Sequence, residues 1–168
     1  AAVDAEALPA PWKNHANKIL GCWPLDGSAK DISGRGMDGT ADSAMGWVFA
    51  RKGQGVRIGP NAGTVKLPAR AVPDGLGALT VSFWMKLETL PPKGANFVPL
   101  AKSMAWQFAI DAYRHMHLAV GTTGAAWYGK DTLAYATTEF QGGAWYHLIG
   151  TYDGSAVRFY VNGKLAGA

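Results

Sequence analysis

The chain has 168 residues, of which 17% are charged and 11% aromatic, with 22 glycines and a formal net charge of +4 at pH 7. Many glycines and aromatic residues with few charges favour short strands joined by tight turns over long solvated helices. The basic residues are scattered along the chain, which argues against a nucleic-acid surface, and no apolar run reaches the roughly 18 residues that a membrane span needs.

The first 17 residues contain Pro9 and Pro11 and show no usable periodicity. We therefore predict an N-terminal arm over residues 1–17 and a domain over residues 18–168. The domain begins with a predicted strand over Ile19–Leu25, and a compact loop dense in glycine and aspartate follows over Asp31–Gly39. Short strands separated by Gly and Pro are expected at residues 46–50, 55–58 and 64–67.

The clearest strand signal lies at Leu79–Leu87, where apolar and polar residues alternate. Further strands are expected at spacings of about ten residues, the rhythm of a sandwich or barrel; they are placed at 96–102, 106–111, 115–120 and 133–137. The count of about ten to twelve strands is enough for two packed sheets.

The segment from Trp145 to Ala168 carries two hairpin signals, Asp153-Gly154 and Asn162-Gly163. These dipeptides tolerate the positive φ angles of tight turns. The residues between them alternate apolar and polar from Val157 to Val161, so the segment predicts a β-meander.

Four motifs stand in one order along the chain: CWPLDG at Cys22–Gly27, DISGRGMDG at Asp31–Gly39, LTVSFWMK at Leu79–Lys86, and WYHLIGTYDG with VRFYVNGKL within 145–165. Together they resemble the laminin-G-like, concanavalin A-like lectin/glucanase superfamily. The resemblance implies an all-β fold, a two-sheet antiparallel β-sandwich of the concanavalin A-like jelly-roll type. Members are commonly non-catalytic modules of extracytoplasmic proteins that bind glycans or proteins, and some hold a calcium ion.

Domains of this family usually continue past the Asn-Gly hairpin and finish with a strand that closes the sheet. Because no such segment follows Asn162-Gly163 here, we expect a separate or cleaved chain, or the rest of a larger protein, to supply it. The chain also begins with Ala1-Ala2 rather than methionine, which fits removal of an export signal and fits a cloning boundary equally well.

The loop Asp31–Gly39 is the candidate for calcium, because hard cations prefer carboxylate and carbonyl oxygens and glycines let carbonyls turn inward. Asp31 and Asp38 are the predicted metal ligands. The alternative is that these aspartates cap their own backbone in turns.

Catalysis is not expected. Glycoside hydrolysis needs two carboxylic acids flanking the bond, whereas Glu6, Glu88 and Glu139 are far apart and none lies in a Glu-x-Asp-x-x-Glu strand like that of the superfamily's glucanases. His115 and His117 share a strand face, but a third metal ligand is not evident in sequence, so we interpret them as a surface pair.

Sugar binding needs an exposed aromatic ring for the apolar face of a pyranose and polar groups for its hydroxyls. The best such set lies in one glycine-rich loop, and two further rings come next. The predicted ligand-binding residues are Trp127, Tyr128, Lys130 and Asp131, followed by Trp106 and Tyr113. The alternative is that these rings pack against the rim of the sandwich.

The sequence therefore predicts a non-catalytic, extracytoplasmic recognition module that is secreted, periplasmic or at the cell surface and binds a glycan or a protein surface. The alternative is a structural or accessory subunit of a larger assembly whose sheet is completed by another chain or segment. A glycan-active enzyme comes third.

Overall fold

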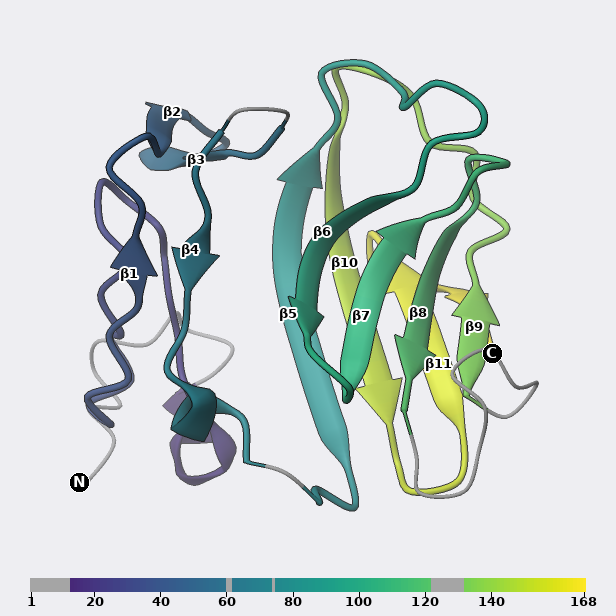
Figure 1. Ribbon diagram of the computed structural model, residues 1–168. Coiled ribbons are helices and arrows are strands. Elements are labelled where there is room, and N and C mark those ends of the chain that lie inside the picture. The colour runs from purple at the N-terminus through teal and green to yellow at the C-terminus, as the bar shows by residue number, and fades with distance from the viewer. Residues whose placement is uncertain (1–12, 60–61, 74, 122–131) are drawn as a thin grey trace. The chain divides into compact units, whose positions relative to one another are not determined.

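The computed structural model describes residues 13–59, 62–73, 75–121 and 132–168 (Figure 1). The chain divides into two compact units, residues 1–73 and 74–168, which are described one at a time. Whether residues 18–168 act as one domain stays a prediction.

The first unit consists of short elements joined by turns. They are η1 (Ala16–Lys18), β1 (Thr40–Ala41), β2 (Gly46–Phe49), β3 (Gln54–Arg57), β4 (Val65–Lys66) and η2 (Ala69–Ala71). Strand β1 pairs with β4 and β2 pairs with β3, each antiparallel. The three strands predicted between residues 46 and 67 are thus confirmed within one or two residues at their ends.

The strand predicted over Ile19–Leu25 is wrong, because no strand is present there. The backbone at Cys22 is bound by the following loop instead: its N–H donates to the Asp31 carboxylate and its carbonyl accepts from Ile32 N–H, both at 2.9 Å. The carboxylate of Asp31 accepts the backbone hydrogen bond that a neighbouring strand would otherwise accept. The alternation of side chains along Ile19–Leu25 does not reveal this.

The second unit holds the remaining eight strands. They are β5 (Leu79–Lys86), β6 (Phe97–Lys102), β7 (Trp106–Ile110), β8 (Met116–Val120), β9 (Leu133–Tyr135), β10 (Trp145–Tyr152), β11 (Val157–Val161) and β12 (Lys164–Gly167). Two four-stranded antiparallel sheets result, with the orders β12-β11-β10-β5 and β6-β7-β8-β9. Figure 1 shows the two sheets as separate layers. The predicted all-β, two-sheet antiparallel sandwich is confirmed.

The core of this unit forms where the two sheets face each other. Phe108 of β7 makes edge-to-face contacts with Phe83 and Phe159, at ring-centroid distances of 4.9 and 5.6 Å. A Cβ added at Gly150 of β10 would lie 2.6 Å from Phe108 Cζ and 2.4 Å from Leu118 Cδ2, so glycine is required for the close approach.

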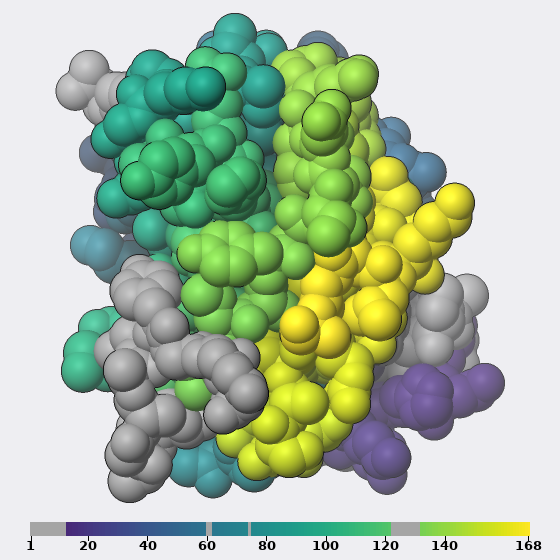
Figure 2. Space-filling model, turned by 90° about the vertical axis from the view of Figure 1, so that its right-hand side faces the viewer, coloured from purple at the N-terminus to yellow at the C-terminus, as the bar shows by residue number. Residues whose placement is uncertain are grey.

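The C-terminal meander forms as predicted. Asn162 and Gly163 have φ angles of 51° and 80°, the two positive values that a type I′ turn needs, and they connect β11 to β12. The outer side of β12 meets the segment after β9, because Thr137 N–H and Oγ1 donate to Ala166 O at 2.8 and 3.0 Å. Figure 2 shows this side, where the yellow C-terminal strands lie beside the light green segment that follows β9.

Candidate functional site

A tight turn between β7 and β8 is built around the carboxylate of Asp111. Its Oδ1 accepts hydrogen bonds from the N–H groups of Tyr113 and His115, both at 2.8 Å, and its Oδ2 lies 3.4 Å from His115 Nδ1. Arg114, between them, has a φ of 72°, a left-handed conformation that costs energy for a residue with a Cβ. The turn is therefore fixed by a side chain that bonds its own backbone.

Aromatic rings from this turn and two strands meet in one row. The Tyr113 ring stacks on His115 at 6.2 Å with an interplanar angle of 27°, His115 meets Tyr135 edge-on at 6.0 Å, and Tyr135 lies 5.2 Å from His117. Tyr135 of β9 is the direct cross-strand partner of His117 of β8, which places both rings on one face of the sheet. We call these four residues the aromatic strip.

Exposure differs along the aromatic strip. Tyr113 is 76% exposed and Tyr135 45%, whereas His117 is 4% exposed at the inner end. Burial lowers the pKa of His117, although a backbone hydrogen bond at His115 and the nearby Asp111 charge act in the opposite direction. At neutral pH the imidazole of His117 is consequently uncharged. It supports the inner end of the aromatic strip, and the outer rings face solvent.

This arrangement offers what a sugar ring requires. Tyr113 and Tyr135 present aromatic faces for the apolar side of a pyranose, and His115, whose side chain is 61% exposed, adds a polar ring between them. Because the Asp111 turn fixes Tyr113 and His115 before any ligand arrives, little ordering entropy has to be lost on binding.

The sequence predicted Tyr113 as a ligand-binding ring but did not join it to Tyr135. The signal was present, since the predicted strands at 115–120 and 133–137 each place alternate residues on one face. What was missing is the pairing register that sets His117 opposite Tyr135, and register follows from the tertiary fold. The histidine pair, predicted to lie on the surface, has one exposed member, His115, and one buried member, His117.

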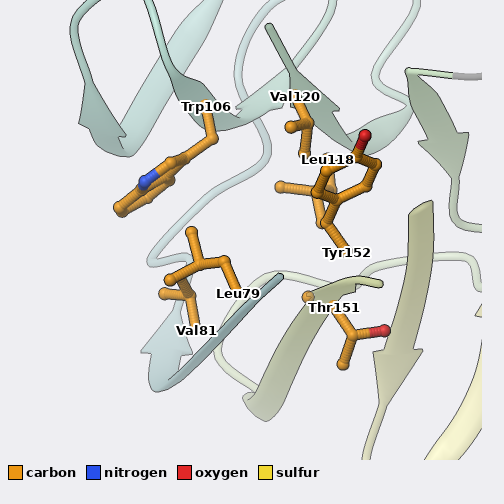
Figure 3. A pocket seen from close by; sticks show the side chains of 8 residues that line it. Leu79, Val81, Trp106, Leu118, Val120, Thr151 and Tyr152 are labelled. Carbon is orange, nitrogen blue, oxygen red and sulfur yellow. The ribbon is translucent and has the colours of Figure 1, made fainter. Parts of the chain in front are cut away.

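Trp106, the other ring predicted from this part of the chain, lies inside the sandwich. It is 7% exposed and meets Phe108 edge-on at 6.3 Å. It also borders a small apolar pocket of about 10 Å³, lined by Leu79, Val81 and Leu118 among others (Figure 3). A space of this size holds at most one water molecule, so the pocket is a packing gap rather than a ligand site.

The other four predicted ligand-binding residues, Trp127, Tyr128, Lys130 and Asp131, lie outside the described residues. Their role stays a prediction.

Asp31, predicted as a metal ligand, is the centre of the Asp31–Gly39 loop. Its two carboxylate oxygens accept hydrogen bonds from the backbone N–H groups of Cys22, Ser33 and Met37 and from the Ser33 hydroxyl, at 2.8 to 3.0 Å. Burial alone would raise the pKa of Asp31, but these hydrogen bonds stabilise the charged form and lower the pKa below its ordinary value.

Asp38, the second predicted metal ligand, accepts a hydrogen bond from Asp31 N–H at 2.8 Å. The two aspartates thus lie together and bind backbone groups of their own loop, the use that the sequence left open as the alternative. Among the residues that the structure describes, no group of three or more His, Cys, Asp or Glu side chains could hold a metal ion. Calcium binding by this loop stays a prediction.

A second aromatic pair lies on the other sheet. Trp84 of β5 stacks on His147 of β10 at 4.8 Å with an interplanar angle of 13°, and Ser82 Oγ lies 2.8 Å from His147 Nε2. Trp84 is 44% exposed. The ring nitrogen of His147 is thus engaged by a neighbouring hydroxyl, which agrees with the usual structural role of a histidine in a half-buried strand.

A two-sheet antiparallel sandwich with exposed rings on a turn agrees with a lectin-like binding module. The sequence matches the family model of the concanavalin A-like lectin/glucanases superfamily over residues 59–168, which include the whole second unit. The chain belongs to this superfamily, as its motifs predicted. Searches of curated proteins and of solved structures gave no match.

Helices η1 and η2 span three residues each. Neither is long and apolar enough to cross a bilayer.

Proposed function

We propose that this chain is a non-catalytic, extracytoplasmic recognition module that binds a glycan through the aromatic strip. The observation that carries the proposal is the row of rings in which Tyr113 and Tyr135 are exposed while the Asp111 turn fixes Tyr113 and His115. Tyrosine rings, which have an apolar body and a polar tip, are enriched at binding surfaces.

A glycan array probed with the intact chain tests this proposal. We expect binding to one or more glycans, with affinity reduced about tenfold or more in Tyr113→Ala and in Tyr135→Ala, because each removes a stacking face. Tyr113→Phe keeps the ring and should retain most of the affinity. Trp84→Ala, which removes an exposed ring from the other sheet, is the matched control. Glycan binding that survives Tyr113→Ala and Tyr135→Ala but is lost in Trp84→Ala would contradict the assignment to the aromatic strip.

The absence of catalysis is part of the proposal. Hydrolysis of a glycosidic bond needs a pair of carboxylic acids, and Asp111 at the aromatic strip already accepts two backbone hydrogen bonds. Glu88, two residues after the end of β5, lies 3.2 Å from Lys86 Nζ. Release of reducing sugar from any glycan that the array identifies would contradict this part.

Calcium is proposed separately from the glycan. An ion at Asp31 and Asp38 would have to displace N–H groups that now bind the same oxygens. Calorimetric titration with calcium chloride, repeated on Asp38→Asn, tests this. Heat of binding that the variant lacks would support calcium binding by this loop, and the absence of heat in the unaltered chain would contradict it.

A structural subunit is the second candidate, and one observation favours it. Strand β5 stands at the end of its sheet, runs for eight residues without Gly or Pro, and pairs with β10 in unbroken register. A long, regular edge of this kind can accept a strand from another chain. Native mass spectrometry of the protein from its source would show a stoichiometric second polypeptide if this candidate holds, and a lone chain that binds glycan would contradict it.

A further inference from the structure

The β2–β3 hairpin of the first unit ends in a basic turn. The strands pair in register from Gly46 opposite Arg57 to Phe49 opposite Gln54, and Ala50 N–H donates to Gly53 O at 3.1 Å. Arg51 and Lys52 are the two central residues of this turn, and both are exposed. Two basic residues are thereby placed at the tip of the hairpin.

The turn rests on the carboxylate of Asp26. Asp26 Oδ1 accepts a hydrogen bond from Gln54 N–H at 2.8 Å, and a Cβ added at Gly53 would lie 2.8 Å from both Asp26 carboxylate oxygens. Gly53 also has a φ of 61°, which glycine adopts without strain. The hairpin tip is therefore preorganised, so that binding through it costs little ordering entropy.

Phe49, the last residue of β2, is 95% exposed. It is the most exposed of the large apolar side chains that the structure describes, and Ile58, directly after β3, is 44% exposed. On the Phe49 side of the hairpin, Trp47 and Val56 form a cross-strand pair and are both partly exposed. An apolar side chain thus projects next to the two cations of the turn.

We propose that this hairpin tip binds the surface of an anionic membrane, with Phe49 entering the interface and Arg51 and Lys52 contacting lipid headgroups. A phospholipid surface combines negatively charged headgroups with an apolar layer directly beneath, and the hairpin combines two cations at its turn with an exposed aromatic ring beside them. The net charge of the chain, +4, favours the same approach.

The binding that follows is reversible and peripheral. One aromatic ring and two basic residues bind no more strongly than a single lipid chain, which by itself gives only marginal membrane affinity. The site therefore concentrates the module at a lipid surface while the aromatic strip, on the second unit, remains a separate recognition surface. The two proposals stand independently, since no residue is common to them.

Sedimentation of the intact chain with vesicles tests the inference. Vesicles of phosphatidylcholine with phosphatidylserine are compared with vesicles of phosphatidylcholine alone, at low and at high salt. We expect binding to the anionic vesicles only and weakening by salt. Phe49→Ala should lower the affinity about 10- to 30-fold, the loss of one buried phenyl ring, and Arg51→Gln and Lys52→Gln about fivefold each.

The control is Met104→Ala, which removes an apolar side chain that is 78% exposed on a turn of the second unit. It should bind vesicles as the unaltered chain does, and circular dichroism of Phe49→Ala should be unchanged because that side chain is exposed. No sedimentation with anionic vesicles, or equal sedimentation of Phe49→Ala, would overturn the proposal. Loss in the basic variants without loss in Phe49→Ala would also overturn it, because charge alone would then explain the binding.

Discussion

The two compact units of this chain are stabilised in different ways. The largest fully buried side chains of the described residues are Phe108, Phe159, Ile110, Met116 and Leu148 in the second unit and Ser33 in the first. In the second unit, apolar side chains of two sheets interdigitate. In the first, Asp31 and Ser33 are buried polar residues that bind the backbone of the loop around them.

This difference determines which kind of change destabilises each unit. A packed core responds to changes in side-chain volume, because the surrounding atoms fill a cavity only in part. A loop that is organised by a carboxylate responds to loss of its acceptors and to pH, because buried N–H groups need a partner. Variants that reduce side-chain volume therefore test the second unit, and variants that remove a hydrogen-bond acceptor test the first.

The largest effect is expected from Phe108→Ala. Phe108 is fully buried and contacts Phe83, Trp106 and Phe159, so its removal should lower the free energy of unfolding of the second unit by about 3–5 kcal/mol. Hydrogen exchange of the β7 and β10 amides would report the loss. Equal loss of protection in the Asp31–Gly39 loop would show that the contrast between the units is wrong.

Asp31→Ala should have the next largest effect, in the first unit. It leaves the N–H groups of Cys22, Ser33 and Met37 without their acceptor, at a cost of about 2–4 kcal/mol. Asp31→Asn keeps one carbonyl oxygen and should cost about half as much. Hydrogen exchange at residues 31–39 measures both. A variant as stable as the unaltered chain would mean that packing, rather than the carboxylate, holds this loop.

Acid should destabilise the two units in different pH ranges. His117 has a lowered pKa in the folded state, so its stabilising effect is complete above the unfolded value of about 6.5 and declines below it, by at most about 1.4 kcal/mol per pH unit. Asp31 also has a lowered pKa, but its effect is complete above about 3.9 and is lost only below that pH. Exchange protection should therefore fall first in β8 and later in the Asp31–Gly39 loop.

His117→Gln is the control for the upper window, because glutamine does not titrate between pH 4 and 7. The decline in β8 protection below about pH 6.5 should disappear in this variant. A decline that persists there would have to come from another group.

The smallest change in stability is expected from Tyr113→Ala. Tyr113 is 76% exposed, so the free energy of unfolding should change by less than about 0.5 kcal/mol even though glycan binding is reduced. Thermal denaturation of this variant beside Phe108→Ala compares an exposed ring with a buried one. A large loss of stability would show that Tyr113 is a packing residue.

The sequence was sufficient for the parts of the fold that depend on local pattern. The alternation at Leu79–Leu87 and the Asn162-Gly163 turn predicted β5 and the β11–β12 hairpin, because side-chain period and positive φ are properties of a few consecutive residues. The order of the four motifs also indicated the superfamily that the family model now matches.

The tertiary structure decided what each aromatic or acidic side chain does. Trp106 begins β7 and Tyr113 lies in the turn that follows it, and both were predicted for the same role. Yet the Trp106 ring lies between the sheets, whereas Tyr113 is 76% exposed. Asp31 could have been a metal ligand or a turn residue in sequence, and its hydrogen bonds depend on where Cys22 and Met37 come to lie. Such choices rest on contacts beyond a residue's immediate neighbours, and the alternation of side chains along one strand carries no information about them.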